Sequence, residues 1–135
     1  MRSQKTGMHN LTVLVLDDEP TVRALLVRFL AGHGYQSAEA GTMREAIDVV
    51  RGTRLDAAIL DVRLPGAGSG LDVLQRLREQ PELQSIPAIV VTGGVLTEDE
   101  ELLVTRQHAY LFYKPEGFES LVGFLDQLLG RDQPH

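Results

Sequence analysis

Apolar residues along this chain follow two patterns that alternate from one end to the other. Short apolar segments, most of them rich in β-branched residues, are typical of strands buried on both faces of a parallel sheet. Longer stretches between them carry apolar residues at helical spacing. Five segments, the second of them weaker, predict strands over residues 11–16, 35–40, 55–60, 86–91 and 109–113.

The stretches between these strands carry apolar residues at the i, i+3, i+4 and i+7 spacing of amphipathic helices. The first and last of the five have the clearest spacing, and the fourth has poor periodicity. Thr42 with Glu45, and Thr97 with Glu100, have the spacing of capping boxes, which mark where helices begin.

Strands that alternate with helices predict a parallel sheet covered by helices on both faces. Right-handed crossovers leave only a few doubly wound arrangements. The predicted fold class is therefore α/β, with five strands and five helices in a three-layer sandwich. We expect a single domain over residues 11–130, a flexible tail at 1–10 and a short tail at 131–135.

Composition narrows the class of protein. The 135 residues include 19 acids and 13 Lys or Arg, a net charge of −6, which argues against direct nucleic-acid binding. The absence of cysteine excludes disulfides and thiolate chemistry and is compatible with a reducing compartment. No apolar run approaches the roughly 20 residues of a membrane span. We therefore expect a soluble cytoplasmic domain without membrane contact.

Polar side chains follow four of the five predicted strands. Asp17 and Asp18 follow the first strand, Asp61 the third, Thr92 the fourth and Lys114 the fifth. The carboxyl ends of parallel strands share one edge of the sheet, where α/β proteins bind ligands. Each residue alone has an ordinary explanation, such as a helix cap, a turn or a solvated charge. Together they predict a site.

Three carboxylates, one hydroxyl and one ammonium suit phosphoryl transfer. Clustered carboxylates repel one another unless they are protonated or bound to a cation, and oxygen ligands select a hard cation such as Mg²⁺, or Mn²⁺. A carboxylate is also a nucleophile toward phosphoryl groups. The cation and the ammonium would then stabilise charge on the transferred group.

Four strings, VLVLDDEPTVR, AAILDVRLPG, IVVTG and LFYKP, resemble the receiver domain of two-component response regulators. The resemblance covers about residues 11–130, with all four motifs in the family's order. The spacing agrees: 43 residues separate Asp18 from Asp61, 31 separate Asp61 from Thr92, and 22 separate Thr92 from Lys114. The resemblance implies a flavodoxin-like sheet with strand order 2-1-3-4-5.

The resemblance also implies the metal site. Asp61 would be the phosphoacceptor and, like Asp18, a direct Mg²⁺ ligand. Asp17 would bind the ion through water, and the backbone carbonyl of Arg63 would complete the protein ligands.

Further residues would contact the phosphoryl group or respond to it. By resemblance these are Thr92, Gly93 and Lys114. The Lys114–Pro115 bond would be cis, which costs only about 0.5–1 kcal/mol for a bond before proline. Tyr110 is the candidate switch aromatic.

The function implied by the resemblance is phosphorelay signalling. Asp61 would accept a phosphoryl group from a phosphohistidine of a sensor kinase or histidine phosphotransfer protein. Phosphorylation would change the face formed by the fourth helix, fifth strand and fifth helix, which would bind partners and permits a homodimer. The protein would be a switch rather than an enzyme, promoting only its own phosphotransfer and dephosphorylation. It would be a stand-alone regulator or part of a larger regulator or hybrid kinase.

Two loops depart from the family's pattern. The loop after Pro65 has four residues before Gly70 where the family usually has three, which a tolerated surface insertion would explain. Gly93 and Gly94 follow Thr92 where the family usually begins with alanine or another small residue. Together with the weak fourth helix, these glycines predict a segment that is locally unstable and rearranges most on phosphorylation.

One side chain departs from the family's pattern, and another has two possible roles. Leu111 stands where the family commonly has its switch aromatic. Either Tyr110 takes that role through a one-residue shift, or the coupling is absent, or the neighbouring aromatics only cover the sheet edge. Alternation places Leu111 and Tyr113 on one face of the strand, and Tyr110 and Phe112 on the other. Arg63 would either overhang the phosphoryl group and slow attack by water, or be solvated.

Three other functions are alternatives to phosphorelay signalling. An aspartyl-phosphate phosphatase would carry a second acid two residues after its nucleophile, where this chain has Arg63, and would need a cap domain. A flavodoxin-like cofactor binder would need a phosphate-cradling loop after the first strand, where the acidic string DDEP repels phosphate. A degenerate receiver that acts only as a scaffold is the third alternative, although all five site residues are present.

Overall fold

The computed structural model describes residues 11–64, 68–114 and 117–131. Strands and helices alternate along the chain, as the apolar pattern predicted. In chain order they are β1 (Leu11–Leu16), α1 (Pro20–Gly32), β2 (Tyr35–Ala40), α2 (Met43–Gly52), β3 (Ala57–Asp61), α3 (Gly70–Glu79), the short 3₁₀ helix η2 (Pro81–Leu83), β4 (Ala88–Thr92), α4 (Glu98–Arg106), β5 (Tyr110–Tyr113) and α5 (Phe118–Leu128).

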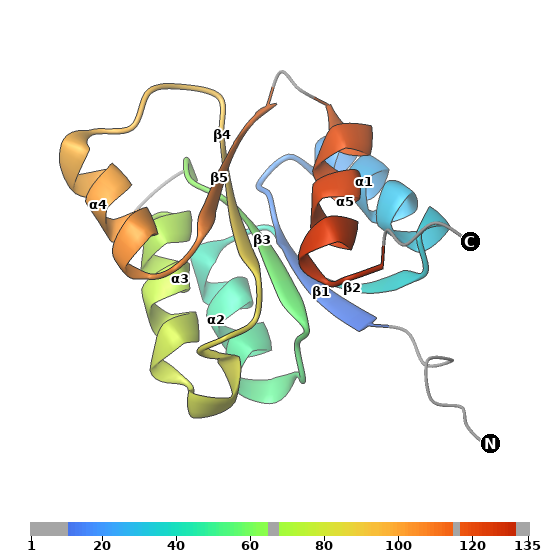
Figure 1. The fold of residues 1–135 in the computed structure, drawn as a ribbon, viewed down its shortest axis with the longest axis horizontal. Helices are drawn as coiled ribbons and strands as arrows, with labels where there is room; N and C mark the ends of the chain where they lie inside the picture. Colours follow the sequence, from blue (N-terminus) through green and yellow to red (C-terminus); the bar gives the residue numbers. More distant parts are fainter. Residues whose placement is uncertain (1–10, 65–67, 115–116, 132–135) are drawn as a thin grey trace.

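The five strands form one parallel sheet in the order β2-β1-β3-β4-β5, which confirms the predicted topology. Helices α1 and α5 cover one face, and α2, α3 and α4 cover the other (Figure 1). The middle strands β1, β3 and β4 are almost fully buried because helices lie on both sides of them.

Each face of the sheet has its own apolar core. On the side of α1 and α5, residues such as Val15, Ile59 and Val91 pack against both helices. On the other side, Leu60 and Val90 are among those that pack against α2, α3 and α4. Successive residues of one strand alternate between the two cores, so each central strand reads as a continuous apolar run.

Two strands end later than the sequence predicted. Asp61 is the last residue of β3 and pairs with Val91, and Thr92 is the last residue of β4 and pairs with Tyr113. The parallel ladders extend one residue beyond the apolar runs. Both side chains are therefore held by the sheet itself rather than by a loop.

Side chains cap three of the helices. Thr97 and Glu100 form the predicted capping box of α4. Thr42 caps α2 by accepting from the backbone N–H of Glu45, but the Glu45 carboxylate accepts from Gly41 rather than from Thr42, so the predicted box is only half formed. Helix α3 has a capping box of Ser69 and Asp72 that the sequence analysis did not predict.

The tails at 1–10 and 132–135 lie outside the described residues, whereas Arg131, placed with the second tail, is described. Its backbone N–H donates to Asp126 O over 2.7 Å, and its guanidinium lies over the Tyr35 ring. In the described part of the chain, no helix is both long and apolar enough to cross a bilayer.

Candidate functional site

Three aspartates meet at the carboxyl edge of the sheet. Asp17 directly follows β1, where its N–H donates to Ala40 O of β2, and Asp61 ends the neighbouring β3. Asp17, Asp18 and Asp61 each offer a carboxylate oxygen within 4.8 Å of the others. The structure therefore brings together the three acids that the sequence analysis assigned to one site.

Backbone and arginine contacts hold the acidic loop in place. The Asp17 carboxylate accepts from the Glu19 N–H over 2.9 Å, and the Arg23 guanidinium donates to the Asp17 backbone carbonyl. Arg23 also pairs with Glu39 of β2 over 3.3 Å. These contacts fix the carboxylate of Asp17 before any ligand binds.

Asp61 is the most constrained of the three acids. Its side chain is only 3% exposed, and Lys114 Nζ, at the end of β5, donates to its Oδ2 over 3.0 Å. The Arg63 N–H donates to its Oδ1 over 3.2 Å. Burial raises the pKa of the Asp61 carboxyl, and the Asp17 charge adds to the rise, although Lys114 and the Arg63 N–H oppose it.

The pKa of the Lys114 ammonium is also raised, which favours its charged form. Burial lowers the pKa of its ammonium, but the hydrogen bond and charge of Asp61 outweigh burial, so the pKa is raised. Lys114 is therefore a cation at neutral pH, and its side chain is still 35% exposed at the mouth of the site. An ammonium in this position can reach a group attached to Asp61.

The acidic cluster fits a hard divalent cation. Three carboxylates beside a single ammonium leave an excess of negative charge, and carboxylate oxygens are the donors that Mg²⁺ and Mn²⁺ prefer. Asp17, Asp18 and Asp61 would supply side-chain oxygens, and the carbonyl of Arg63 follows Asp61 closely enough in the chain to be a further donor.

The Thr92 hydroxyl is bonded within its own loop. Thr92 is fully buried, and its Oγ1 donates to Gly94 O and accepts from Gly94 N, both over 3.2 Å. Its position at the end of β4 puts it on the same sheet edge as Asp61 and Lys114. The hydroxyl would have to leave Gly94 to donate to a group on Asp61.

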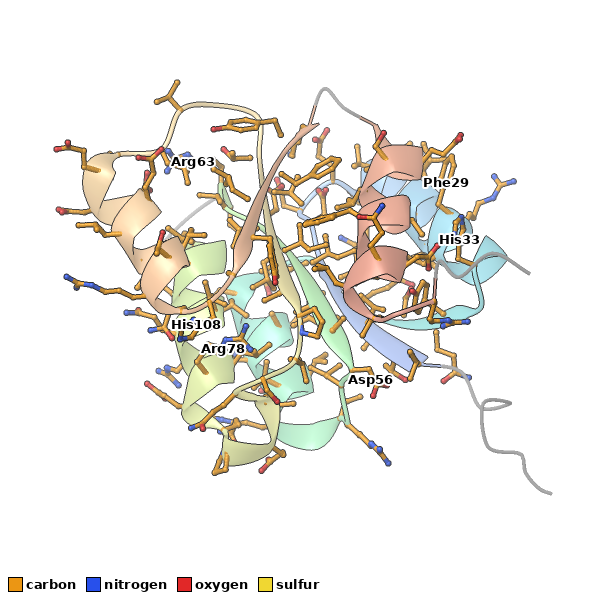
Figure 2. The ribbon with its side chains drawn as sticks, in the orientation of Figure 1. Phe29, His33, Asp56, Arg63, Arg78 and His108 are labelled. Atoms are coloured by element: carbon orange, nitrogen blue, oxygen red, sulfur yellow. The ribbon has the colours of Figure 1, made fainter. Side chains whose placement is uncertain are left out.

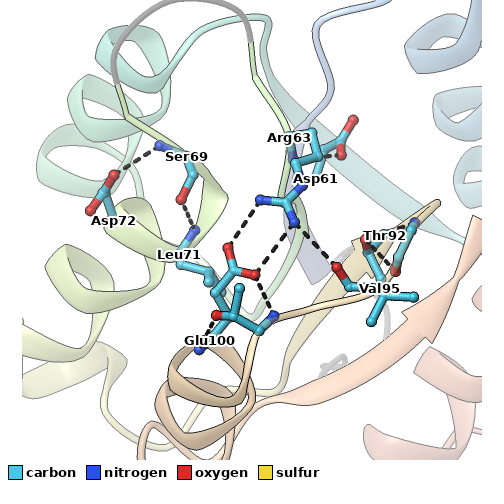
Figure 3. Close-up of polar contacts among 10 residues, drawn as sticks. Asp61, Arg63, Ser69, Leu71, Asp72, Thr92, Val95 and Glu100 are labelled. Carbon is cyan, nitrogen blue, oxygen red and sulfur yellow. Dashed lines mark hydrogen bonds and ion pairs between the residues drawn. The ribbon is translucent and has the colours of Figure 1, made fainter.

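The Arg63 side chain is directed toward the start of α4 (Figure 3). Its guanidinium pairs with Glu100 over 3.0 Å and donates to Val95 O over 3.4 Å, while 57% of the side chain is exposed. Both contacts connect the segment that follows Asp61 to the segment that follows Thr92. Neither sequence interpretation, an overhanging or a purely solvated arginine, included this pair.

The side chains of β5 alternate between faces, with Tyr110 and Phe112 on one side and Leu111 on the other, as predicted. Tyr110 packs edge-on against Phe124 of α5, with ring centroids 5.4 Å apart, and Phe112 belongs to the same side. Leu111 packs into the core beneath α3 and α4. The resting position of Tyr110 is therefore on the α5 face, and a switch role for it stays a prediction.

Two predictions fall on residues that the structure does not describe. The Lys114–Pro115 peptide bond, predicted to be cis, includes Pro115, and most of the longer loop after residue 64 falls in the gap at 65–67.

An apolar cavity of about 160 Å³ lies behind the site, between the sheet and helices α1 and α5. Val22, Leu26, Phe112 and Leu121 are among its lining residues, and Asp61 reaches its edge. Low-dielectric surroundings of this kind account for the strong effect of burial on the Asp61 carboxyl.

The family model of the response regulator receiver domain matches residues 13–126, most of the chain. This chain belongs to the response regulator receiver family. Receiver domains of this family take part in two-component signalling, bind Mg²⁺ at an acidic pocket and interact with histidine kinases or phosphotransfer proteins.

Curated relatives support the assignment of this receiver domain. The "Probable transcriptional regulatory protein TcrX" of Mycobacterium tuberculosis is 37% identical over 120 residues, which cover 89% of this chain and 50% of that protein. The polar-differentiation response regulator DivK of Brucella anthropi is 32% identical over 90 residues, covering 67% of this chain and 72% of DivK. The receiver domain thus spans about half the length of the first relatives it matches.

Solved structures share the fold of this receiver domain. The chemotaxis protein CheY4 of Vibrio cholerae superposes with a TM-score of 0.79 at 24% identity, covering 88% of this chain and 98% of CheY4. The receiver domain of a sensor histidine kinase from Pseudomonas aeruginosa, with a magnesium ion coordinated in its active-site cleft, has a TM-score of 0.76 at 23% identity, covering 90% of this chain and 98% of that one.

Sequence reasoning did not identify two residues that shape this receiver domain's site, Glu100 and Gly70, and one that anchors α4 away from it, Arg78. Glu100 was assigned only as a cap, whereas it also binds Arg63. Gly70 packs so close to the acceptor strand that a Cβ would collide with the backbone carbonyl of Asp61. Arg78 is partly buried and donates to four backbone carbonyls (Figure 2). Of these three, only Gly70 could have been found from the sequence, because it directly follows the loop beside the acceptor.

Proposed function

We propose that this receiver domain accepts a phosphoryl group on Asp61 from a phosphohistidine of a sensor kinase or histidine phosphotransfer protein. The observation that carries the proposal is the buried Asp61 carboxylate, bonded to Lys114 over 3.0 Å and close to two further aspartates. Asp17 and Asp61 are buried, and three carboxylates this close repel one another unless a proton or a cation offsets their charge. Their chemistry fits a phosphoryl acceptor.

In the transfer, an Asp61 carboxylate oxygen attacks the phosphorus of the phosphohistidine. A new O–P bond forms, the P–N bond breaks, and its electron pair stays on the imidazole nitrogen, which takes up a proton. The attacking oxygen must be ionised, and the Lys114 ammonium favours that form against the cost of burial. The product is an aspartyl phosphate.

Residues around Asp61 would then stabilise the phosphoryl oxygens. Bound Mg²⁺ would supply positive charge against the phosphoryl oxygens and offset the repulsion among the aspartates. Lys114 would move its hydrogen bond from the Asp61 carboxylate to a phosphoryl oxygen. Thr92 would exchange the Gly94 carbonyl for another phosphoryl oxygen, and Gly93 permits this movement of the loop.

The output surface is the face of α4, β5 and α5. Three large apolar or aromatic residues are exposed there or at its margin: Leu102, Tyr110 and Tyr113. Movement of the loop after Thr92 would change the position of α4 on this face. We propose that it binds an effector, with a second copy of the chain as an alternative, and that the protein works in the cytoplasm without contacting nucleic acid or membrane directly.

Phosphorylation can be tested with a small-molecule donor. The protein is incubated with Mg²⁺ and acetyl phosphate or phosphoramidate and examined by intact-mass spectrometry. We expect a labile mass increase of about 80 Da, one phosphoryl group. The adduct should be absent without a divalent cation and absent in Asp61→Asn.

Matched variants test the roles of the other acids. Asp18→Asn should raise the Mg²⁺ concentration needed for half-maximal phosphorylation at least tenfold, because it removes a direct ligand. Glu19→Gln removes the next acid in the chain and should change that concentration little. An adduct that persists in Asp61→Asn, or an equal Mg²⁺ requirement for both variants, would contradict the proposal.

A further inference from the structure

The side chain of Arg63 connects two loops that both begin at the phosphorylation site. Arg63 lies two residues after Asp61, and its own N–H donates to the Asp61 carboxylate over 3.2 Å. Its guanidinium reaches across to Glu100 over 3.0 Å and to Val95 O over 3.4 Å. We call residues 93–97, between β4 and α4, the β4–α4 loop. Arg63 thus joins the acceptor segment to the far end of this loop.

Glu100 transmits this contact to the whole first turn of α4. The same carboxylate that pairs with Arg63 also accepts from the Thr97 N–H over 2.8 Å, and the Thr97 hydroxyl accepts from the Glu100 N–H over 3.1 Å. This capping box joins the end of the β4–α4 loop and the first turn of α4 into one unit. The contact of Arg63 with Glu100 therefore restrains the start of the helix as well as the Glu100 side chain.

The near end of the β4–α4 loop is held separately. Gly94 N and O both bond to the Thr92 hydroxyl over 3.2 Å. The loop is therefore held at one end by Thr92 and at the other by Arg63, and the glycines between give it the freedom to move. Val95 is 88% exposed, whereas Leu96 is only 6% exposed and belongs to the apolar core beneath α2, α3 and α4. Side-chain packing therefore supports the far end of the loop together with Arg63, and residues 93–95 lie exposed.

We propose that Arg63 is a positioning residue that restrains the β4–α4 loop in its resting state through Glu100 and the Val95 carbonyl, and so opposes movement of Thr92 toward a phosphorylated Asp61. The Thr92 hydroxyl is tied to this loop by two hydrogen bonds with Gly94, so turning it toward a phosphoryl oxygen releases the near end of the loop. Movement of the loop strains or breaks the contacts of Arg63. The pair therefore sets how easily this receiver switches, and this inference rests on the proposed function.

The first test measures the loop itself, without phosphorylation. Amide hydrogen exchange over residues 93–97 is compared between the wild type, Arg63→Ala and Glu100→Gln. The glutamine keeps an oxygen that can accept from Thr97 but loses the charge that pairs with Arg63. We expect exchange about two- to fivefold faster in both variants, the range for an exposed ion pair.

The matched control is Glu101→Gln. It removes one acid from the same first turn of α4, without a side-chain contact to Arg63 in the described residues. Its exchange over residues 93–97 should equal that of the wild type. Unchanged exchange in Glu100→Gln, or an equal rise in Glu101→Gln, would overturn the proposal.

The second test measures switching. With Mg²⁺ and phosphoramidate, Glu100→Gln should be phosphorylated about two- to fivefold faster than Glu101→Gln, because the loop is released more easily. Arg63→Lys keeps the charge and should remain near the wild-type rate, while combining Arg63→Ala with Glu100→Gln should add nothing to the single effects. Equal or slower phosphorylation of Glu100→Gln would contradict the restraint.

The two proposals fail in different ways. If the wild type forms no adduct on Asp61, the proposed function is wrong, whatever the exchange of the loop shows. If the wild type is phosphorylated but Glu100→Gln changes neither exchange nor rate, only the role of Arg63 is wrong.

Discussion

An arginine from another element holds each end of α4, and the two differ in almost every physical respect. Arg63 binds the half-buried carboxylate of Glu100 in the first turn and the Val95 carbonyl in the loop before it. Arg78 of α3 binds the two residues that directly follow α4, where it donates to Gln107 O over 2.8 Å and His108 O over 3.3 Å. The two ends of one helix are therefore anchored with very different strength.

Arg78 also ties α4 to the opposite end of the sheet from the site. It donates to Leu83 O over 2.7 Å, at the end of η2, and to Ile86 O over 2.9 Å, just before β4. Burial lowers the pKa of the Arg78 guanidinium, as expected for a cation that has lost water and gained only neutral partners. Removing it would leave several carbonyls without a donor.

This difference suggests how α4 moves. The polar contacts of Arg63 at the end beside the site can be replaced by water and salt. The far end is bonded to Arg78, which is itself fixed by carbonyls of two other segments, Leu83 and Ile86. A change at Asp61 therefore reaches the end that is easiest to move. We expect α4 to pivot about the end that Arg78 holds.

The largest expected effect comes from breaking the fixed end. Arg78→Ala should lower the free energy of unfolding by about 2–4 kcal/mol, because it removes the donor of four carbonyl hydrogen bonds, three of them partly buried, and the packing between α3 and the residues after α4. Urea unfolding followed by circular dichroism measures the change. Arg76→Ala, an exposed arginine two residues earlier, should change stability by less than about 0.5 kcal/mol.

A small effect of Arg78→Ala would mean that the far end of α4 is not anchored. The two ends of α4 would then be held about equally, and α4 would not pivot about the end that Arg78 holds.

The second prediction concerns the charges beside the movable end. Asp61→Asn should raise stability at pH 7 by about 0.5–2 kcal/mol in the absence of Mg²⁺, since burial and Asp17 disfavour the ionised carboxyl. A raised pKa in the folded state favours folding at pH values below the ordinary carboxyl pKa, and this contribution is lost as pH rises through the folded pKa.

The difference between Asp61→Asn and wild type should therefore shrink as pH falls through the raised pKa of the folded Asp61 carboxyl, because the folded wild type then becomes neutral at this position, as asparagine is. Thermal unfolding across this pH range measures it. Added Mg²⁺ should stabilise the wild type more than Asp61→Asn; a constant difference at every pH would contradict the assignment.

The third prediction compares two threonines, one at each end of α4. Thr97→Ala should cost about 1 kcal/mol, because Thr97 caps the helix and orders the turn that Arg63 binds. Thr105→Ala removes only a hydrogen bond to the Glu101 carbonyl within the helix, and it should be nearly neutral. Chemical denaturation compares the two, and equal losses would show that the first turn is not a special unit.

The fold could be predicted largely from the sequence because its signal is repeated in every element. Apolar runs identified all five strands, and helical spacing, prolines and caps identified the helices. The errors are at boundaries. A ladder of backbone hydrogen bonds extends β3 to Asp61, one residue beyond the apolar run. Because Asp61 is polar, the pattern of apolar side chains does not include it in the strand.

Less of the candidate site could be predicted. Asp17, Asp18 and Asp61 could be grouped because strand ends share an edge, a rule of topology. The pair of Arg63 with Glu100 joins residues 37 apart, one on the loop after β3 and one in the first turn of α4. No local pattern specifies which of several nearby acids an exposed arginine will meet. The carbonyls that bind Arg78 belong to the backbone and leave no trace in residue identity.

The smallest effect on stability is expected for Arg63→Ala. This variant tests most directly whether the end of α4 beside the site is held more weakly than the far end. Arg63→Ala should change the free energy of unfolding by less than about 1 kcal/mol, because the pair with Glu100 is exposed and both groups regain water when it breaks. The change should shrink further in about 1 M NaCl, where the Debye length falls to roughly 3 Å.

The Arg78→Ala loss, by contrast, should persist in high salt, because neutral carbonyls inside the protein are not screened. Parallel urea titrations of both variants at low and high salt provide the measurement. If Arg63→Ala cost as much as Arg78→Ala, the end of α4 beside the site would be as firmly held as the far end. A weak, salt-sensitive contact is what allows Arg63 to restrain the loop and still release it within the energy that one phosphoryl group supplies.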